Sequence, residues 1–182
     1  MLRGPPDPDI LFVTISLLGI SLAASLVSPH TLPLTTASSA VTDPGQSGRI
    51  AAYAVADRAA DVNLMLAALN HRRAAKGLGP LQLDSRLCDV AYEHAADMSV
   101  RNYFDHNTPE GLTPFQRMTR AHVPYGYAGE NMALDQSTSA AELALWQSPE
   151  HRDNILQPHY AKVGIAAVTS TDGLIFVEDF SD

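Results

Sequence analysis

The spacing of apolar residues changes once along this chain, and this change limits the fold more than any other feature. From Asp57 onward, apolar residues recur every three or four positions, which is the spacing of one helix face. Near the C-terminus the segments 163–168 and 174–180 are short apolar runs separated by the turn residues 171–173. Two such runs around an Asp-Gly turn are typical of a β-hairpin. The pattern predicts an α+β fold in which helices pack on a small, mostly antiparallel sheet.

Cap residues divide the helical part into five segments. The expected helices begin at or near Asp57, Asp84, Thr113, Ser139 and Ser148. Thr113 with Gln116 and Ser139 with Glu142 have the spacing of a capping box, and Pro114 and Pro149 suit a first helical position. The first helix is expected to stop at Gly77 and the second near Asn102. Leu143 and Trp146 are expected to form the apolar face of the fourth.

The N-terminal part has the composition of a targeting segment. A mostly apolar run without charges extends over residues 10–27 and follows Arg3. Its length lies between that of a long signal peptide and that of a marginal membrane helix, so residues 1–27 are a signal peptide or an N-terminal membrane anchor. Small residues at 38–40 suit a signal peptidase but lie some way past the apolar run. Residues 28–56 are expected to be a flexible linker, and residues 57–182 a single domain.

Charge and cysteine content exclude two classes of protein. The formal net charge is −8, and no cluster of Lys and Arg is available to follow a phosphate backbone, so nucleic acid is excluded as a partner. Cys88 is the single cysteine of the 182 residues, so no disulfide can form within them. Its position in a helical apolar pattern favours a buried, inert thiol.

Two histidines and a glutamate are the candidate functional residues. His106 follows the segment 102–105, Glu130 lies between Gly129 and Asn131, and His151 follows Ser-Pro-Glu. Imidazole and carboxylate suit zinc, and without metal they can serve as proton donor, acceptor and orienting group. The glycines near Glu130 are expected to bend segment 125–131 sharply and bring this carboxylate close to other elements.

Each candidate also has a purely structural interpretation. Glu130 could be a buried carboxylate bonded to a backbone amide, and His151 could bridge the restart of a helix. His94 lies on an apolar stripe and is expected to be a core histidine with one satisfied ring nitrogen, and Trp146 is expected in the core. Glu178 and Asp179 alternate in direction, and solvation of an edge strand would explain both.

The order of these motifs resembles the bacterial branch of the CAP superfamily, which groups cysteine-rich secretory proteins, antigen 5 and plant pathogenesis-related proteins. The resemblance covers about residues 57–180. It implies a three-layer α-β-α sandwich, an extracytoplasmic location, and a cleft with two histidines and acidic residues that binds zinc in several members. His106 and His151 match the cleft histidines, which are the expected metal ligands, and Glu130 matches the acid of the Gly-Glu-Asn motif.

The chain departs from the family pattern at two neighbouring positions. Pro149 stands where many eukaryotic relatives have a second glutamate, so the cleft is at most a triad. Glu150 stands where the bacterial motif usually has glycine. This residue could supply the missing carboxylate, but favourable charge placement at a helix N-terminus is the simpler interpretation.

Three classes of function remain open. The first, which we favour, is a secreted or membrane-anchored module that binds a lipid, a cell-envelope glycan or a protein and holds zinc weakly. The second is a metal-dependent hydrolase, a peptidase or cell-envelope hydrolase, in which zinc on His106 and His151 activates water and Glu130 acts as base. Two histidine ligands are few for catalytic zinc. The third is a scaffold whose motif serves folding alone.

Overall fold

The computed structural model describes residues 58–182. The expected leader and linker lie outside these residues. Within the described part, no helix combines the length and apolar character needed to cross a membrane.

A four-stranded sheet forms the middle of the fold. Its strands are β1 (Gln82–Leu83), β3 (Lys162–Thr169), β4 (Leu174–Ser181) and β2 (Ala128–Asp135), side by side in that order. The strands β3 and β4 form the expected hairpin, β2 pairs antiparallel with β4, and β1 alone runs parallel to its neighbour. The sheet is therefore mostly antiparallel, as the sequence predicts.

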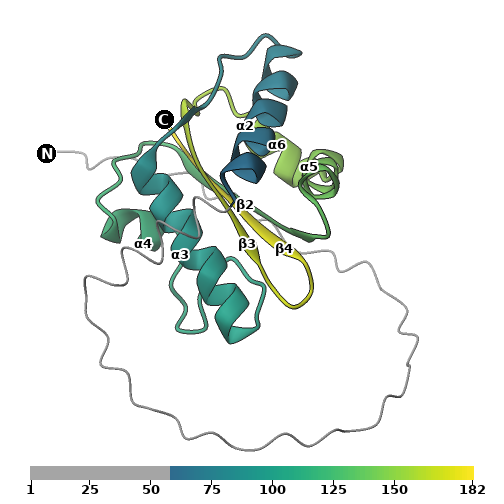
Figure 1. Cartoon of the computed structure of the whole chain (residues 1–182). Coiled ribbons are helices and arrows are strands. Elements are labelled where there is room, and N and C mark those ends of the chain that lie inside the picture. Colours follow the sequence, from purple (N-terminus) through teal and green to yellow (C-terminus); the bar gives the residue numbers. More distant parts are fainter. Residues whose placement is uncertain (1–57) are drawn as a thin grey trace, which may run out of the picture.

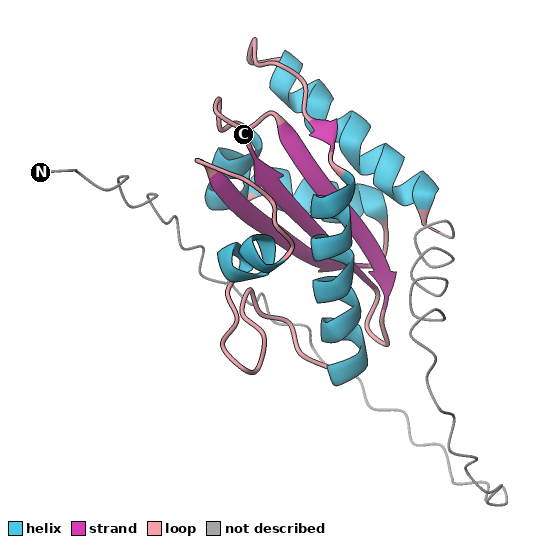
Figure 2. Cartoon of the chain, turned by 90° about the vertical axis from the view of Figure 1, so that its left-hand side faces the viewer, coloured by secondary structure: helices cyan, strands magenta, loops and turns pink. Residues whose placement is uncertain are grey.

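Helices cover both faces of this sheet (Figures 1 and 2). On one side lie α3 (Ser85–Arg101) and α4 (Pro114–Arg120), and on the other lie α2 (Ala59–Ala74), α5 (Thr138–Gln147) and α6 (Pro149–Ile155). Successive side chains of a strand point to opposite faces. Met132 thus joins an apolar cluster with α3, whereas Ala133 joins a cluster with α2 and α5. This arrangement confirms the three-layer α-β-α sandwich.

The helix starts mostly follow the predicted caps. Asp84 accepts hydrogen bonds from the backbone at the start of α3, and Thr113 forms the expected capping box with Gln116. The predicted capping box of Ser139 with Glu142 is wrong, because α5 begins earlier and has Ser137 as its N-cap. Glu142 is not free to cap the helix, because it forms a salt bridge with Arg72 of α2, 2.9 Å from Glu142 Oε1 to Arg72 Nε.

Two other expectations fail because neighbouring strands decide what is buried. Residues 128–131 belong to strand β2 rather than to a sharply bent connection. Glu178 and Asp179 are not on a solvated edge, since β4 lies between β2 and β3 and both side chains are fully buried. The sheet thus carries two carboxyl groups in its interior, one facing each helical layer.

Three side chains of the helical layers also differ from expectation. Leu143 is 47 % exposed, and Leu145 takes its place in the core. Trp146 packs against the core but is only partly buried, with the Arg72 guanidinium 4.6 Å from its ring centroid. Cys88 is partly exposed, and the burial that it does have raises the pKa of its thiol.

Candidate functional site

The two candidate histidines line one pocket. The pocket has a volume of about 240 Å³ and lies between the loop after α3, strand β2 and the junction of α5 with α6. Its walls are mainly apolar, with His106, His151, Ser148 and Glu150 as polar members; the others are Phe104, Met132, Ala133, Leu134, Ala144 and Leu145. The structure therefore brings together His106 and His151, which are distant in sequence, and adds Glu150.

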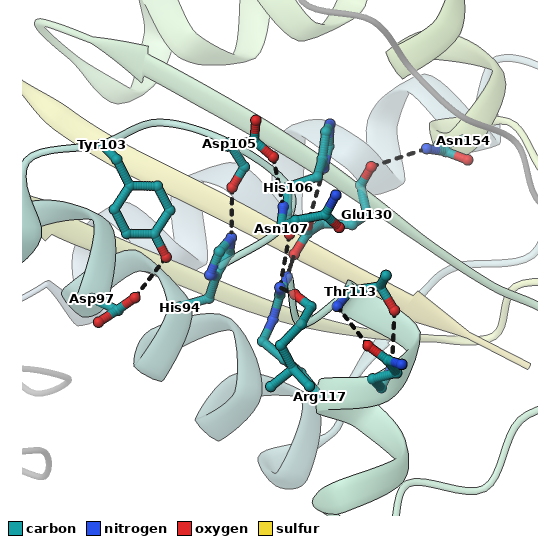
Figure 3. Close-up of polar contacts among 12 residues, drawn as sticks. His94, Asp97, Tyr103, Asp105, His106, Asn107, Thr113, Arg117, Glu130 and Asn154 are labelled. Atoms are coloured by element: carbon teal, nitrogen blue, oxygen red, sulfur yellow. Dashed lines mark hydrogen bonds and ion pairs between the residues drawn. The ribbon is translucent and has the colours of Figure 1, made fainter. Parts of the chain in front are cut away.

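Glu130 contacts His106 (Figure 3) and is not among the residues that line the pocket. Its Oε1 is 2.7 Å from His106 Nδ1, and its Oε2 accepts a hydrogen bond from Arg117 Nη2. The carboxylate is 2 % exposed. Since Nδ1 of His106 is engaged with Glu130, the nitrogen left for a pocket ligand is Nε2. Glu130 acts on the pocket by orienting His106.

Arg117 is a site residue that the sequence reasoning missed. It extends from α4, where its Nη1 donates to the backbone carbonyls of His106 (2.7 Å) and Leu112 (3.2 Å), while Nη2 donates to Glu130. The guanidinium thus fixes both the backbone of His106 and the carboxylate that orients the ring. The one signal in the sequence is indirect: a buried carboxylate needs a cationic partner.

Asn131 performs a similar task on the opposite face of β2. Its Nδ2 donates to the backbone carbonyl of His151 (3.2 Å) and to Glu178 Oε2 (3.1 Å). Asn154 of α6 in turn donates to the Asn131 side chain (3.0 Å) and to the Glu130 backbone carbonyl (3.2 Å). Two consecutive residues of one strand therefore hold the two histidine-bearing segments from opposite faces of the sheet.

The comparisons with known proteins show the family of this domain. Residues 66–180 match the sequence model of the cysteine-rich secretory protein family, CAP. The chain belongs to this family. The matched range contains His106, Glu130 and His151. It also contains Arg117 and Asn131, whose side chains donate hydrogen bonds to the backbone carbonyls of His106 and His151.

Similar proteins occur in several bacteria. The uncharacterized protein YkwD of Bacillus subtilis is 38% identical over 112 residues, which are 61% of this chain and 43% of YkwD. The chain thus spans less than half the length of this relative. An extracellular protein containing an SCP domain from Bacillus anthracis is 28% identical with a TM-score of 0.60, covering 79% of this chain and 45% of that one. An outer surface protein of Borrelia burgdorferi shares the fold, with a TM-score of 0.64 at 24% identity, over 69% of this chain and 94% of that one.

Gly129 allows α6 and its neighbours to approach β2 in this CAP domain. A Cβ atom at this position would lie 2.4 Å from Tyr160 Oη and 2.9 Å from Asn154 Oδ1. Tyr160 cannot move away easily, because it is buried and stacks on Phe180 with ring centroids 5.3 Å apart. The glycine is therefore required by close packing and not by a bend of the backbone.

Replacing Gly129 by alanine is expected to destabilise the protein by about 1–3 kcal/mol, the usual effect of overpacking. Tyr160→Phe removes the nearest atom, so the double variant should recover part of this loss in urea unfolding measurements. Gly126→Ala is the matched control, because a Cβ there would meet one atom at the ordinary distance of 3.4 Å. Equal losses for Gly126→Ala and Gly129→Ala would contradict the packing argument.

Burial dominates the acid-base behaviour of several groups around the CAP site. His94 behaves as expected of a core histidine: Nε2 lies 3.0 Å from the Asp105 carbonyl, and burial lowers its pKa. Burial, and next the charge of His106, lower the pKa of His151. On β4, burial raises the pKa of Glu178 to about 8 and that of Asp179 well above its ordinary value.

The donor atoms present limit what metal this CAP domain could hold. Across residues 58–182, no three His, Cys, Asp or Glu side chains are placed to share one metal ion. His106 and His151 supply two imidazoles in one pocket, while both oxygens of Glu130 are already engaged. This donor set fits a weakly held zinc ion that completes its coordination with water or a ligand. It does not fit a catalytic zinc with three protein ligands.

Proposed function

We propose that this CAP domain is an extracytoplasmic, non-enzymatic module that binds a small ligand in the pocket between His106 and His151. The observation that carries this proposal is the engagement of Glu130. A general base must face the reacting molecule, whereas the Glu130 carboxylate is buried between Arg117 and His106 Nδ1. The acid expected to do chemistry is used to position a histidine.

The pocket has the features of a small-molecule site. Such sites combine mainly apolar walls with a few polar groups that orient the ligand. Here Phe104, Met132 and Leu145 supply apolar surface, while His106 and His151 supply polar atoms. A lipid or an apolar part of a cell-envelope molecule fits these walls better than a strongly hydrated sugar chain does.

Extracytoplasmic placement is supported by two relatives and by the N-terminal sequence. The Bacillus anthracis relative is described as extracellular and the Borrelia protein as an outer surface protein. The apolar run 10–27 of this chain suits export or anchoring, and it lies outside the described residues.

A hydrolase remains a second candidate because of one observation, the pairing of Glu130 with His106 Nδ1. A carboxylate in this position orients the imidazole, so that Nε2 in the pocket could accept a proton from water. Release of product from peptide or cell-envelope substrates, lost in His106→Asn, would favour this candidate. Binding without turnover would favour the module.

Zinc titration of the full chain tests whether the pocket histidines act as ligands. We expect calorimetry to detect one weakly bound zinc ion, and at least about tenfold weaker binding in the double variant His106→Ala, His151→Ala. The control removes the exposed His71 and His159 in the same way and should bind as the unmodified chain does. Equal binding by both double variants would show that zinc binds elsewhere, and circular dichroism confirms that each variant is folded.

A further inference from the structure

Glu150 is an exposed acidic residue that borders the pocket. It is the second residue of α6 and lies beside Ser148, whose hydroxyl donates to Glu150 Oε2 at 3.4 Å. Both residues line the pocket together with His106 and His151. The favourable effect of the helix N-terminus on an acidic residue accounts for the position of Glu150 in the helix. This helix effect does not explain why the acidic side chain also borders a pocket. A ligand bound in that pocket would lie beside the charge.

The charged pair behind His106 is internally compensated. Glu130 and Arg117 form a buried ion pair, with side chains 2 % and 8 % exposed, so together they carry no net charge. Among the residues that line the pocket, Glu150 is the one acidic residue, and none is a lysine or an arginine.

The remaining wall is apolar. Phe104, Met132 and Leu145 contribute hydrocarbon or thioether surface, and the volume of about 240 Å³ suits a short alkyl chain or a ring. A ligand that fills this space and meets a lone carboxylate gains from carrying a positive charge and loses from carrying a negative one.

We propose that the pocket selects a small apolar ligand that carries a positively charged amine, with Glu150 as the counter-ion that determines this specificity. This inference rests on the proposed function, because it names the ligand class of the same pocket. The alkyl part lies against the apolar walls, and the ammonium group lies at the α6 end, beside Glu150 and Ser148. The formal net charge of −8 adds a weaker attraction at long range.

Three probes of equal length test the selection: octylammonium, octan-1-ol and octanoate. Their binding to the full chain is measured at pH 8 and low salt, with a chelator present so that no divalent cation occupies the pocket. We expect octylammonium to bind about tenfold more tightly than octanoate, the effect of reversing a unit charge about 5 Å from a solvated carboxylate.

Two variants assign this preference to one side chain. Glu150→Gln should reduce the ratio between octylammonium and octanoate to about twofold or less, since the wall then lacks its one acidic residue. Asp153→Asn removes an equal charge from an exposed position of the same helix outside the pocket wall and should leave the ratio nearly unchanged.

The probes separate failure of this inference from failure of the proposed function. If octan-1-ol binds and the two charged probes bind equally, the pocket is a ligand site but Glu150 does not select amines. A preference for octanoate, or equal effects of Glu150→Gln and Asp153→Asn, would also overturn the inference. If none of the three probes binds, the proposed binding function itself fails.

Discussion

Replacing Glu130 by alanine is expected to lower the free energy of unfolding by about 3–5 kcal/mol, the usual loss when one partner of a buried ion pair is removed. The reason is Arg117, whose 8 % exposed side chain would remain buried without its anionic partner. The variant should also bind zinc more weakly, since His106 loses the carboxylate that orients its ring. Urea unfolding and zinc calorimetry measure the two effects.

An exposed ion pair provides the matched control for this prediction. Arg101 and Glu110 are joined at 2.6 Å, but both lie in solvent, where water and salt weaken their attraction. Glu110→Gln should therefore change stability little. If Glu130→Ala is no more destabilising than Glu110→Gln, the buried pair does not hold the site together.

A double-mutant cycle separates the two roles of Glu130. Arg117→Met in the Glu130→Ala background removes the unpaired charge, so it should restore part of the stability lost in Glu130→Ala alone. It should not restore zinc affinity, because His106 still lacks its carboxylate. Recovery of both properties would show that Glu130 acts on the pocket through stability alone.

Raising the pH from about 5 to 8 is expected to destabilise the protein through the two carboxyl groups buried on β4. Burial raises the pKa of Glu178 from 4.5 to about 8. Burial also raises the pKa of Asp179 well above its ordinary value. In the unfolded chain these groups ionise near pH 4, whereas in the folded chain they retain their protons. The unfolded state therefore binds fewer protons across this range, and stability falls as pH rises through it.

Glu178→Gln isolates one of these groups. Glutamine has the shape of the protonated acid and can still accept the hydrogen bond from Asn131 Nδ2. The variant should exceed the unmodified protein in stability at pH 8 by several kcal/mol, on the order of 1.4 kcal/mol per unit of pKa shift, and match it near pH 4. Urea unfolding at several pH values measures the difference.

The remaining pH dependence of this variant is assigned to Asp179. Neither oxygen of Asp179 has a hydrogen-bond partner within residues 58–182, so Asp179→Asn in the same background should flatten the profile further. Glu93→Gln removes a carboxylate from an exposed position of α3 and should leave the decline intact. A pH profile that is the same in the unmodified protein and in the Glu178→Gln, Asp179→Asn variant would contradict the assignment.

The arrangement of strand β2 explains why the pocket depends on neighbouring residues with different tasks. Gly129 admits Tyr160 and Asn154, Glu130 orients the His106 ring, and Asn131 holds the backbone of His151. Because side chains alternate along a strand, adjacent residues reach opposite helical layers. One short segment therefore joins the two halves of the pocket.

Local interactions determined much of the fold, and the sequence alone predicted those parts. The box of Thr113 with Gln116, the cap at Asp84 and the hairpin of β3 with β4 depend on residues close together in the chain. The order of the motifs also indicated the family and the histidines that share a pocket. The caps and the hairpin depend on hydrogen bonds and apolar spacing that neighbouring residues provide, whereas the two histidines were indicated by the resemblance to the family.

Tertiary structure alone decided the rest. Arg117 reaches Glu130 because α4 crosses the face of β2, and no local pattern marks this contact. Glu178 and Asp179 are buried because β2 takes the edge beside β4, which made an apparent edge strand an interior one. Burial and charge pairing result from segments distant in sequence packing together. For this reason the sequence located the two histidines, whereas only the packed fold assigned Glu130 to holding one of them.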